Sequence, residues 1–342
     1  MASCQHGKDA VPVRPQKPAP APDRPGKVQS FEIYVRPGFS HLELSSVIAV
    51  LQAASALETG VHFTWQVASD LPGLVSSSSE ILVRAEPAIG DQYLKDYLFV
   101  TGGRNCRGGN WMQRARAMQK LRRPVFLLSD AATAYIRSSA RLSGPVTTHW
   151  QDARALAETG DYPTVSNRLA EENAGIFTCA GHAHTAEIVI RLLSGVLSPQ
   201  DCAELTSAMT LETARGFSGE QPKGAGGNFN FLGGKLAKAV AIMEESVETP
   251  LPTAVIAERA GLSVRHLERL FLTHLDTTPA RHYRRVRLKL AGKLIADTSL
   301  PVVDIALACG FPSSASLAKA YRHEFGVTPH QLRNSKKGGR AG

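Results

Sequence analysis

The sequence between residues 251 and 333 contains one pattern twice, and this duplication limits the possible folds more than any other feature. The first copy reads IAERAGLSVRHLERLF (256–271), and the second reads IALACGFPSSASLAKAY (305–321). Up to Leu262 and Phe311 the two copies lie 49 positions apart, and from Leu267 and Leu317 onwards they lie 50 positions apart. The pattern therefore predicts two similar structural units, the second with one extra residue in its turn.

Each copy reads as a short helix, a glycine turn and a second helix. In the first copy Thr253 and Ser263 are suited to cap the two helices, and Gly261 can adopt the left-handed conformation that ends the first. Apolar residues at helical spacing give each second helix a buried face. The positions left outside carry cations and hydroxyls, as in helix-turn-helix readers of the DNA major groove. The predicted DNA-contacting residues are Ser263, Arg265, His266, Arg269, Ser314, Ser316, Lys319 and Arg322.

The segment between the two copies, residues 280–296, contains no proline, and its apolar residues repeat every three or four positions. We expect one continuous helix of roughly 25 Å, at about 1.5 Å per residue. Such a helix is compatible with two recognition helices about one DNA turn, roughly 34 Å, apart. Its outer face is expected to carry Arg281, Arg284, Arg285, Arg287, Lys289 and Lys293.

These features together closely resemble the AraC/XylS DNA-binding domain, in which a linker helix joins two helix-turn-helix units. The likeness covers residues from about 235 to 333 and includes IALACGF at 305–311 and FGVTP at 325–329. The resemblance implies double-stranded promoter DNA, RNA polymerase and a second copy of the chain as partners. Within the DNA-binding part we expect more base specificity from the first unit, since it offers Arg265 and His266 where the second offers mostly hydroxyls and Lys319.

Charge is distributed unevenly along the 342 residues. Residues 232–342 contain 17 Lys and Arg against 9 Asp and Glu, whereas residues 29–231 contain 17 against 19. A basic surplus confined to the duplicated region fits a polyanionic partner and predicts DNA binding that weakens steeply with salt.

Five cysteines are scattered without any Cys-x-x-Cys pair: Cys4, Cys106, Cys179, Cys202 and Cys309. An odd, unpaired set favours a reducing compartment and argues against zinc. We expect neither a metal nor a cofactor. No apolar run approaches the roughly 18 residues of a membrane span, and the proline-rich amino terminus lacks a signal-peptide core. These observations predict a soluble cytoplasmic protein with no membrane partner.

The composition divides the chain into successive segments. From Phe31 onwards strands and helices alternate, which predicts an α/β domain with a parallel sheet flanked by helices, flavodoxin-like in class. The duplicated region predicts an all-α domain. The expected segments are a disordered proline-rich tail (1–28), an α/β effector-sensing domain (29–215), a glycine-rich linker (216–231), the DNA-binding domain (232–334) and a basic tail (335–342).

The α/β segment resembles the PfpI-like or class I glutamine amidotransferase-like domain that is fused to AraC-type readers in the GlxA family of regulators. The likeness is carried by RPGFSHLELSSVI from Arg36, DYLFVTGG from Asp96, VTTHW at 146–150, which we expect to form a strand, and FTCAGH at 177–182. Catalytic relatives place a cysteine at a sharp turn between a strand and a helix. The corresponding position here holds Ser129, for which the sequence assigns no base, and no glycine follows it.

Asp130 adds negative charge beside that turn, which would oppose formation of a thiolate or an oxyanion. Cys106 lies between Arg104 and Arg107, and Cys179 ends a strand that reads as core. We therefore expect a domain that is not an enzyme. The alternative is a PfpI-like hydrolase or amidase fused to a DNA-binding domain, and a second alternative is a constitutive DNA-binding protein with a purely structural α/β domain.

A ligand pocket is expected where loops and helix starts converge at the carboxyl ends of the strands. Glycine backbone donors and Arg104 could meet a carboxylate, while Trp150 or Trp111 could face a quaternary ammonium group. Trp150 could instead be core, and the histidines could instead cap a helix. The predicted ligand-binding residues are Gly102, Gly103, Arg104, Ser129, Asp130, His149, Trp150, His182 and His184. The family resemblance implies activation of catabolic genes by an amino acid, betaine or carnitine-like effector.

Overall fold

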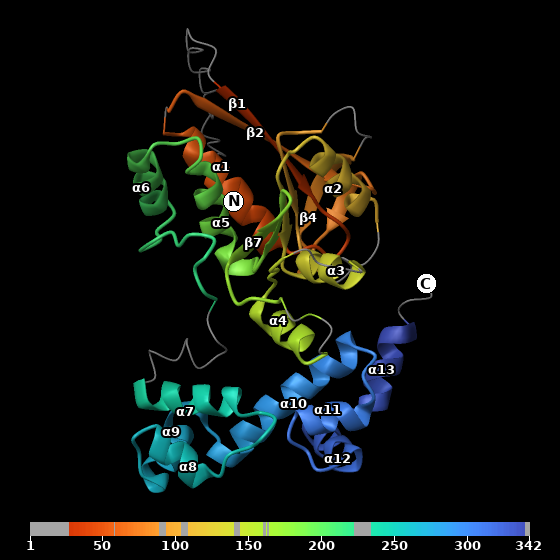
Figure 1. Cartoon of the computed structure of the whole chain (residues 1–342), viewed down its shortest axis with the longest axis vertical. Helices are drawn as coiled ribbons and strands as arrows, with labels where there is room; N and C mark the ends of the chain where they lie inside the picture. Colours follow the sequence, from red (N-terminus) through yellow and green to blue (C-terminus); the bar gives the residue numbers. More distant parts are fainter. Residues whose placement is uncertain are drawn as a thin grey trace, which may run out of the picture.

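The structure is a computed structural model, and it describes residues 27–57, 59–88, 94–103, 109–139, 144–159, 162, 164–221 and 234–338. Figure 1 shows two parts, an α/β part formed by the first two thirds of the chain and a helical part formed by the last third. Within these described ranges, no helix combines the length and the apolar character needed to cross a lipid bilayer.

The described residues of the first part form one eight-stranded sheet with the order β3-β4-β2-β1-β5-β6-β8-β7. The edge pairs β3–β4 and β7–β8 are antiparallel, and the pairs between them are parallel. The central strands read YLFV and VFLL because both faces of the sheet are covered. The strands are β1 (Lys27–Tyr34), β2 (Val61–Ser69), β3 (Gly73–Ser76), β4 (Leu82–Pro87), β5 (Tyr97–Val100), β6 (Val125–Leu128), β7 (Ala170–Asn173) and β8 (Ile176–Cys179).

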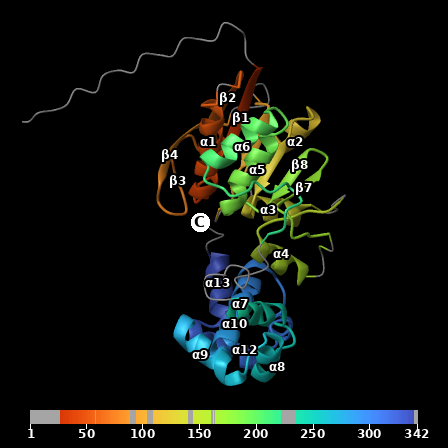
Figure 2. The ribbon, with the colours of Figure 1, turned by 90° about the vertical axis from the view of Figure 1, so that its left-hand side faces the viewer.

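Helices lie on both sides of this sheet (Figure 2). On one side α1 (His41–Ser55), α5 (Thr185–Leu193) and α6 (Pro199–Ala208) share an apolar core with the strands. On the other side α2 (Trp111–Lys120) and α3 (Asp130–Ser138) form a second core. The short helices η2 (His182–His184) and α4 (Trp150–Ala157) complete this part, and α4 lies on the side of the helical part. The predicted class, a parallel sheet flanked by helices, is confirmed.

Two segments differ from expectation inside this part. Residues 146–150, expected as a strand, contribute a single bridge between Val146 and Val165 before α4 begins at Trp150. Strand β1 begins at Lys27, so the last two residues of the expected tail belong to the sheet. Residues 1–26 lie outside the described residues.

The start of the linker, expected at residue 216, also differs, because the α/β part extends further along the chain. The Phe217 ring lies 5.4 Å from the Phe177 ring and 6.3 Å from the Phe126 ring, and Gln221 is 2% exposed. Residues 217–221 therefore pack onto the α/β part, because an aromatic ring and an amide in this stretch both find buried partners there. Residues 222–233 lie outside the described residues.

The helical part contains two apolar clusters joined by one long helix. The first cluster takes residues from α7, α8, α9 and the start of α10, and the second from the rest of α10 with α11 and α12. Helix α13 reaches four residues into the expected basic tail. The helices are α7 (Gly234–Glu245), α8 (Thr253–Arg259), α9 (Val264–Leu275), α10 (Pro279–Asp297), α11 (Val302–Ala308), α12 (Ser314–Phe325) and α13 (Pro329–Gly338).

The duplication is visible in the helix ends. Helices α8 and α11 begin at residues 253 and 302, which is 49 positions apart, and α9 and α12 begin at 264 and 314, which is 50 apart. Gly261 and Gly310 have φ of 70° and 68°, the left-handed conformation expected of the turn glycines. Ser263 and Ser313 cap the second helix of each unit by accepting the backbone N–H three residues on. Thr253 makes no side-chain cap and is instead the first helical residue.

Candidate functional site

The second helix of the first unit, α9, exposes the residues expected to read DNA. Arg265 and Arg269 are exposed, and His266 is half-buried. The Ser263 hydroxyl accepts the His266 backbone N–H at 3.2 Å. Ser263 therefore has a capping role besides any contact with DNA, and Arg265 and Arg269 present exposed positive charge on this helix face.

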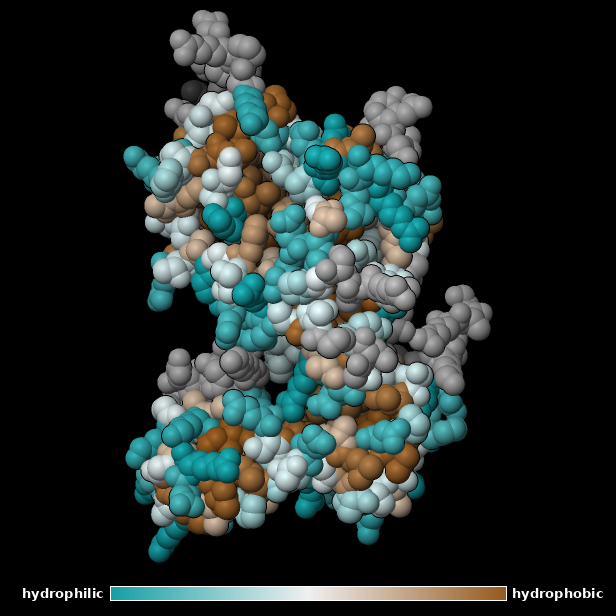
Figure 3. Space-filling model, viewed as in Figure 1, coloured by the Kyte–Doolittle hydropathy of each residue, from teal (hydrophilic) through white to brown (hydrophobic). Residues whose placement is uncertain are grey.

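The second unit presents a different surface on α12. Lys319 and Arg322 are exposed, whereas Ser314 and Ser316 are half-buried. An open pocket of about 540 Å³ lies along this helix, lined by Ala318, Lys319, Arg322, His323 and Thr328. Apolar residues also reach the surface of this unit, and Figure 3 shows them over α11, where Val303 is 48% and Leu307 56% exposed.

Helix α10 carries a basic face, but two of its six expected members point elsewhere. Arg281, Arg284, Arg285 and Lys289 are exposed. The Arg287 guanidinium lies 4.7 Å from the Phe311 ring centroid and donates to the Gly310 carbonyl at 2.9 Å.

Arg287 thus fastens α10 to the second unit, and burial lowers the pKa of its guanidinium. Lys293 pairs with Asp152 of the α/β part at 2.8 Å. Helical spacing predicted that both residues lie on the outer face of α10. Spacing alone does not reveal which neighbouring element packs against that face.

At the carboxyl ends of the central strands, the chain turns sharply at Ser129. Its φ is 37°, and the residue is completely buried. The Ser129 hydroxyl donates to Glu43 Oε1 at 2.7 Å. A buried hydroxyl bound to a carboxylate is a structural donor, and such a hydroxyl is a poor nucleophile.

Glu43 is the central residue of this site, and sequence reasoning did not single it out. It is 0% exposed and lies in the first turn of α1. Besides Ser129, it accepts the backbone N–H of Gly102 at 2.7 Å and of His182 at 2.8 Å. Its position between Leu42 and Leu44 was the signal that could have identified it, since a carboxylate flanked by apolar residues needs partners if it is buried.

Asp130 and two histidines lie around this centre. The backbone N–H of Gly103 donates to Asp130 Oδ2 at 3.1 Å. Burial, and next the charge of Asp152, raise the pKa of Asp130 to about 6. The rings of His149 and His182 meet edge to face with centroids 4.5 Å apart. Burial, and next the neighbouring His182, lower the pKa of His149 to about 4.

The remaining predicted ligand residues divide between the site and other clusters. Trp150 follows His149 at the start of α4, and their ring centroids lie 5.7 Å apart. Trp111, the alternative aromatic, is 0% exposed within the core. His184 belongs to a different cluster, where its Nδ1 lies 3.1 Å from Glu187.

Glu187 in turn binds Arg215, whose guanidinium lies 2.6 Å from the carboxylate. Burial opposes ionisation of Glu187, but the hydrogen bonds from Arg215 prevail and bring its pKa to about 2. Arg104 and Cys106 lie outside the described residues. Among the residues with described positions, no group of three or more His, Cys, Asp or Glu is placed to hold a metal ion.

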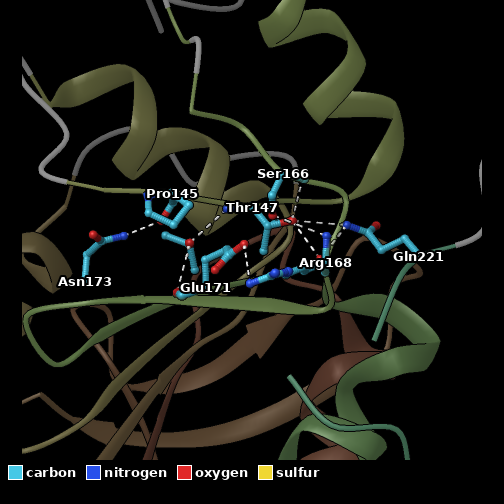
Figure 4. A network of polar contacts seen from close by, with 8 residues as sticks. Pro145, Thr147, Ser166, Arg168, Glu171, Asn173 and Gln221 are labelled. Carbon is cyan, nitrogen blue, oxygen red and sulfur yellow. Dashed lines mark hydrogen bonds and ion pairs between the residues drawn. The ribbon is translucent and has the colours of Figure 1, made fainter. Parts of the chain in front are cut away.

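A polar network connects the Ser129 turn to the segment that leads out of the α/β part. Thr148 Oγ1 donates to the Ser129 carbonyl at 2.8 Å, and Gln221 Nε2 donates to the Thr148 carbonyl at 2.7 Å. Figure 4 shows that Gln221 also reaches Thr147 and the Arg168 carbonyl, at 3.2 and 3.0 Å. Sequence reasoning missed Gln221 because it lies in a stretch rich in glycine.

Two exposed recognition helices held by one linker helix define the class of the protein, a DNA-binding protein with paired helix-turn-helix units. Residues 256–335 match the family model described as a helix-turn-helix domain. The chain belongs to the AraC/XylS-type transcriptional regulators, and it is similar to the regulator GlxA over most of its length.

Relatives extend over both parts of the chain. The HTH-type transcriptional regulator CdhR of Pseudomonas aeruginosa is 29% identical over 308 residues, covering 89% of this chain and 91% of CdhR. The regulator GlxA of Rhizobium meliloti is 28% identical over 318 residues, covering 90% of this chain and 96% of GlxA. The crystal structure of a transcriptional regulator with an AraC-type DNA-binding domain, from Chromobacterium violaceum, is 43% identical over 30% of this chain and 91% of that chain, with a TM-score of 0.29. The protein is therefore a DNA-binding transcriptional regulator that acts on double-stranded DNA.

Proposed function

We propose that this regulator responds to a small metabolite with a cationic group, an amino acid, betaine or carnitine-like compound, bound at the site around Asp130. The observation that carries the proposal is the meeting of carboxylates and aromatic rings at the carboxyl ends of β5 and β6. Ligands of open α/β sheets collect at this edge. Gly102, Gly103, Ser129, His182 and the expected Arg104 complete the proposed binding residues. His184 is left out, because its ring binds Glu187.

The charge of the site favours a cation over an anion. Asp130 keeps a raised pKa because it lies buried near other carboxylates, Asp152 and Glu43. A bound cation would relieve that repulsion. His149 and Trp150 offer ring faces, which attract a quaternary ammonium group that cannot donate hydrogen bonds.

The site is proposed to bind its ligand without chemical turnover. Ser129 offers no free hydroxyl, since its Oγ donates to Glu43. Purified protein incubated with a panel of amides, esters and aldehydes should release no product above background. Release of product that disappears in Ser129→Ala would instead support the hydrolase alternative.

The proposed outcome of effector binding is activation of transcription in the cytoplasm through RNA polymerase. Val303 and Leu307 on α11 are exposed apolar residues beside the DNA-reading helix and are suited to a protein partner. Replacing both with serine should leave DNA affinity unchanged and lower transcription in a reconstituted assay. Unchanged transcription would remove α11 as the contact.

A homodimer is proposed through the edge of the sheet. Strands β3 and β4 carry Leu74 and Leu82, which are 74% and 59% exposed, and Leu71 beside them is 63% exposed. Unpaired apolar edges of this kind associate readily. Mass photometry should show the parent chain as a dimer and the Leu74→Glu, Leu82→Glu variant as a monomer, whereas a monomeric parent would reject the proposal.

The effector proposal is tested by a thermal-shift screen of the full chain. Amino acids, betaines, carnitine derivatives and, as a contrast, dicarboxylates should be compared at equal concentration. A cationic or zwitterionic compound should raise the melting temperature of the parent protein, and this shift should be lost in Asp130→Asn. A shift produced by dicarboxylates alone would contradict the proposed ligand class.

A further inference from the structure

Helix α4 lies between the two parts of the molecule (Figures 1 and 2). Its amino terminus belongs to the site, because His149 is its N-cap residue and Trp150 its first residue. The opposite end and one face pack against the carboxyl-terminal half of α10. One short helix thus touches both the ligand site and the DNA-binding part.

The apolar contact of α4 is with the second helix-turn-helix unit. Ala155 is 0% exposed and belongs to the same apolar cluster as Leu288, Leu294 and Phe311. Among the described residues, the buried cluster of the first unit draws on positions 236–283 and does not include Ala155. The cluster of Ala155 includes Val247, from the turn after α7, and otherwise takes its buried members from residues 288–321. The α/β part therefore shares its core mainly with the second unit.

A partly buried ion pair crosses the same interface. Lys293 Nζ lies 2.8 Å from Asp152 Oδ1, and the two side chains are 23% and 10% exposed. A partly buried pair of this kind depends strongly on geometry, because loss of either partner leaves a desolvated charge. The pair therefore fixes the register of α4 against α10.

Asp152 also belongs to the electrostatics of the ligand site. After burial, its charge is the largest cause of the raised pKa of Asp130. Lys293 likewise contributes, more weakly, to the lowered pKa of His149. The carboxylate of Asp152 therefore faces a lysine of the DNA-binding part and at the same time influences the centre of the site.

We propose that α4 is an interdomain clasp, closed by Asp152 and Lys293, which restrains the second helix-turn-helix unit until a cation bound beside Asp130 competes for Asp152. The competing cation rests on the function proposed above, whereas the clasp itself rests on the interface. In the closed state Asp152 holds negative charge beside the basic helix α10. Opening removes that charge from the DNA-binding part and frees the second unit to adjust to its half-site.

The clasp is tested without any effector in the full-length protein. Asp152→Asn keeps the size of the side chain and removes the ion pair, and Glu212→Gln, on an exposed position of the α/β part, makes the same charge change as a control. DNA affinity is measured on a labelled duplex selected from random sequence with the parent chain. We expect Asp152→Asn to bind about five-fold more tightly or better, as is typical of coupled sites, and Glu212→Gln to bind like the parent.

A second pair of variants distinguishes the effect of breaking the clasp from the effect of removing a positive charge from α10. Lys289 is exposed on α10, so Lys289→Met should weaken DNA binding, whereas Lys293→Met should strengthen it. Hydrogen exchange should be faster in residues 150–157 of Asp152→Asn and Lys293→Met, and unchanged in the controls. Parent-like DNA affinity and exchange in both clasp variants would overturn the proposal, and this outcome would leave the effector screen unaffected.

Discussion

At the scale of single residues, the site is organised by a buried carboxylate. Glu43 accepts three hydrogen bonds, one from a side chain and two from the backbone, and these hold the Ser129 turn, the glycine loop at Gly102 and the start of η2 together. Hydrogen bonds to charged groups each contribute about 1.5–3 kcal/mol. Glu43 is thus the residue on which the shape of the site depends most.

Replacement of Glu43 by glutamine should destabilise the α/β part. The amide offers one acceptor oxygen where the carboxylate offers two, so at least one of the three donors is left unsatisfied. We expect a loss of about 2–4 kcal/mol in the free energy of unfolding, measured by urea denaturation. Glu204→Gln, on the exposed face of α6, serves as the control and should change stability by less than about 0.5 kcal/mol.

Asp130 gives the site a pH dependence whose sign follows from its pKa. The folded-state pKa of about 6 exceeds the ordinary value of 3.8. The folded state therefore holds its proton more tightly, and stability falls as pH rises from about 4 to about 6. Asp130→Asn removes this loss, so the variant should be more stable than the parent by about 2 kcal/mol at pH 8 and equal to it near pH 3.5.

Calorimetry at the two pH values measures this difference directly. His149 acts in the opposite direction, because its lowered pKa makes the folded state lose stability as pH falls from 6.5 to about 4. Both the parent and Asp130→Asn contain His149, so comparing the two proteins at the same pH cancels that contribution. A stability gain that is the same at both pH values would show that Asp130 is not the titrating group.

At the scale of elements, the two helix-turn-helix units share a fold and differ in surface. Their helices begin 49 and 50 residues apart as the sequence predicted, since capping serines and turn glycines are local signals. The exposure of Arg265, Arg269, Lys319 and Arg322 was also predictable from helical spacing, whereas Ser314 and Ser316 are half-buried. The partners of Arg287 and Lys293 were not, because they depend on Phe311 and Asp152, which spacing along α10 cannot reveal.

The difference between the recognition helices predicts unequal roles in reading DNA. Arg265→Ala should relax sequence discrimination at one half-site by about 1–3 kcal/mol. Lys319→Ala should weaken binding to all sequences more evenly. Competition binding on a panel of single-base variants distinguishes the two, and loss of discrimination in Lys319→Ala alone would reverse the assignment.

Arg287 is predicted to stabilise the joint between α10 and the second unit. Arg287→Met removes the contact with the Phe311 ring and the hydrogen bond to the Gly310 carbonyl. We expect a cost of about 1–3 kcal/mol, seen as a lower denaturation midpoint. The exposed Arg284→Met should cost less than about 0.5 kcal/mol and serves as the matched control.

At the scale of the whole molecule, the sequence predicted the two parts and their classes but not the contact between them. The alternation of strands with helices and the duplicated motif both recur along the chain, so they can be recognised from the sequence alone. The role of α4 could not be, because residues 146–150 read as a strand and Ala155 carries no signal of its own. The predicted site residues Ser129 and Asp130 lie at the strand ends, yet Glu43, which binds the Ser129 hydroxyl, comes from α1, far away in sequence.

The central claim is that the α/β site controls DNA binding by the paired units. Its most direct test is the dissociation constant for the selected duplex, measured by fluorescence anisotropy with the full chain, with and without a saturating concentration of the compound that gives the largest thermal shift. The account predicts a change of at least about five-fold that is absent in Asp130→Asn. An effector that stabilises the protein and leaves this constant unchanged would contradict it.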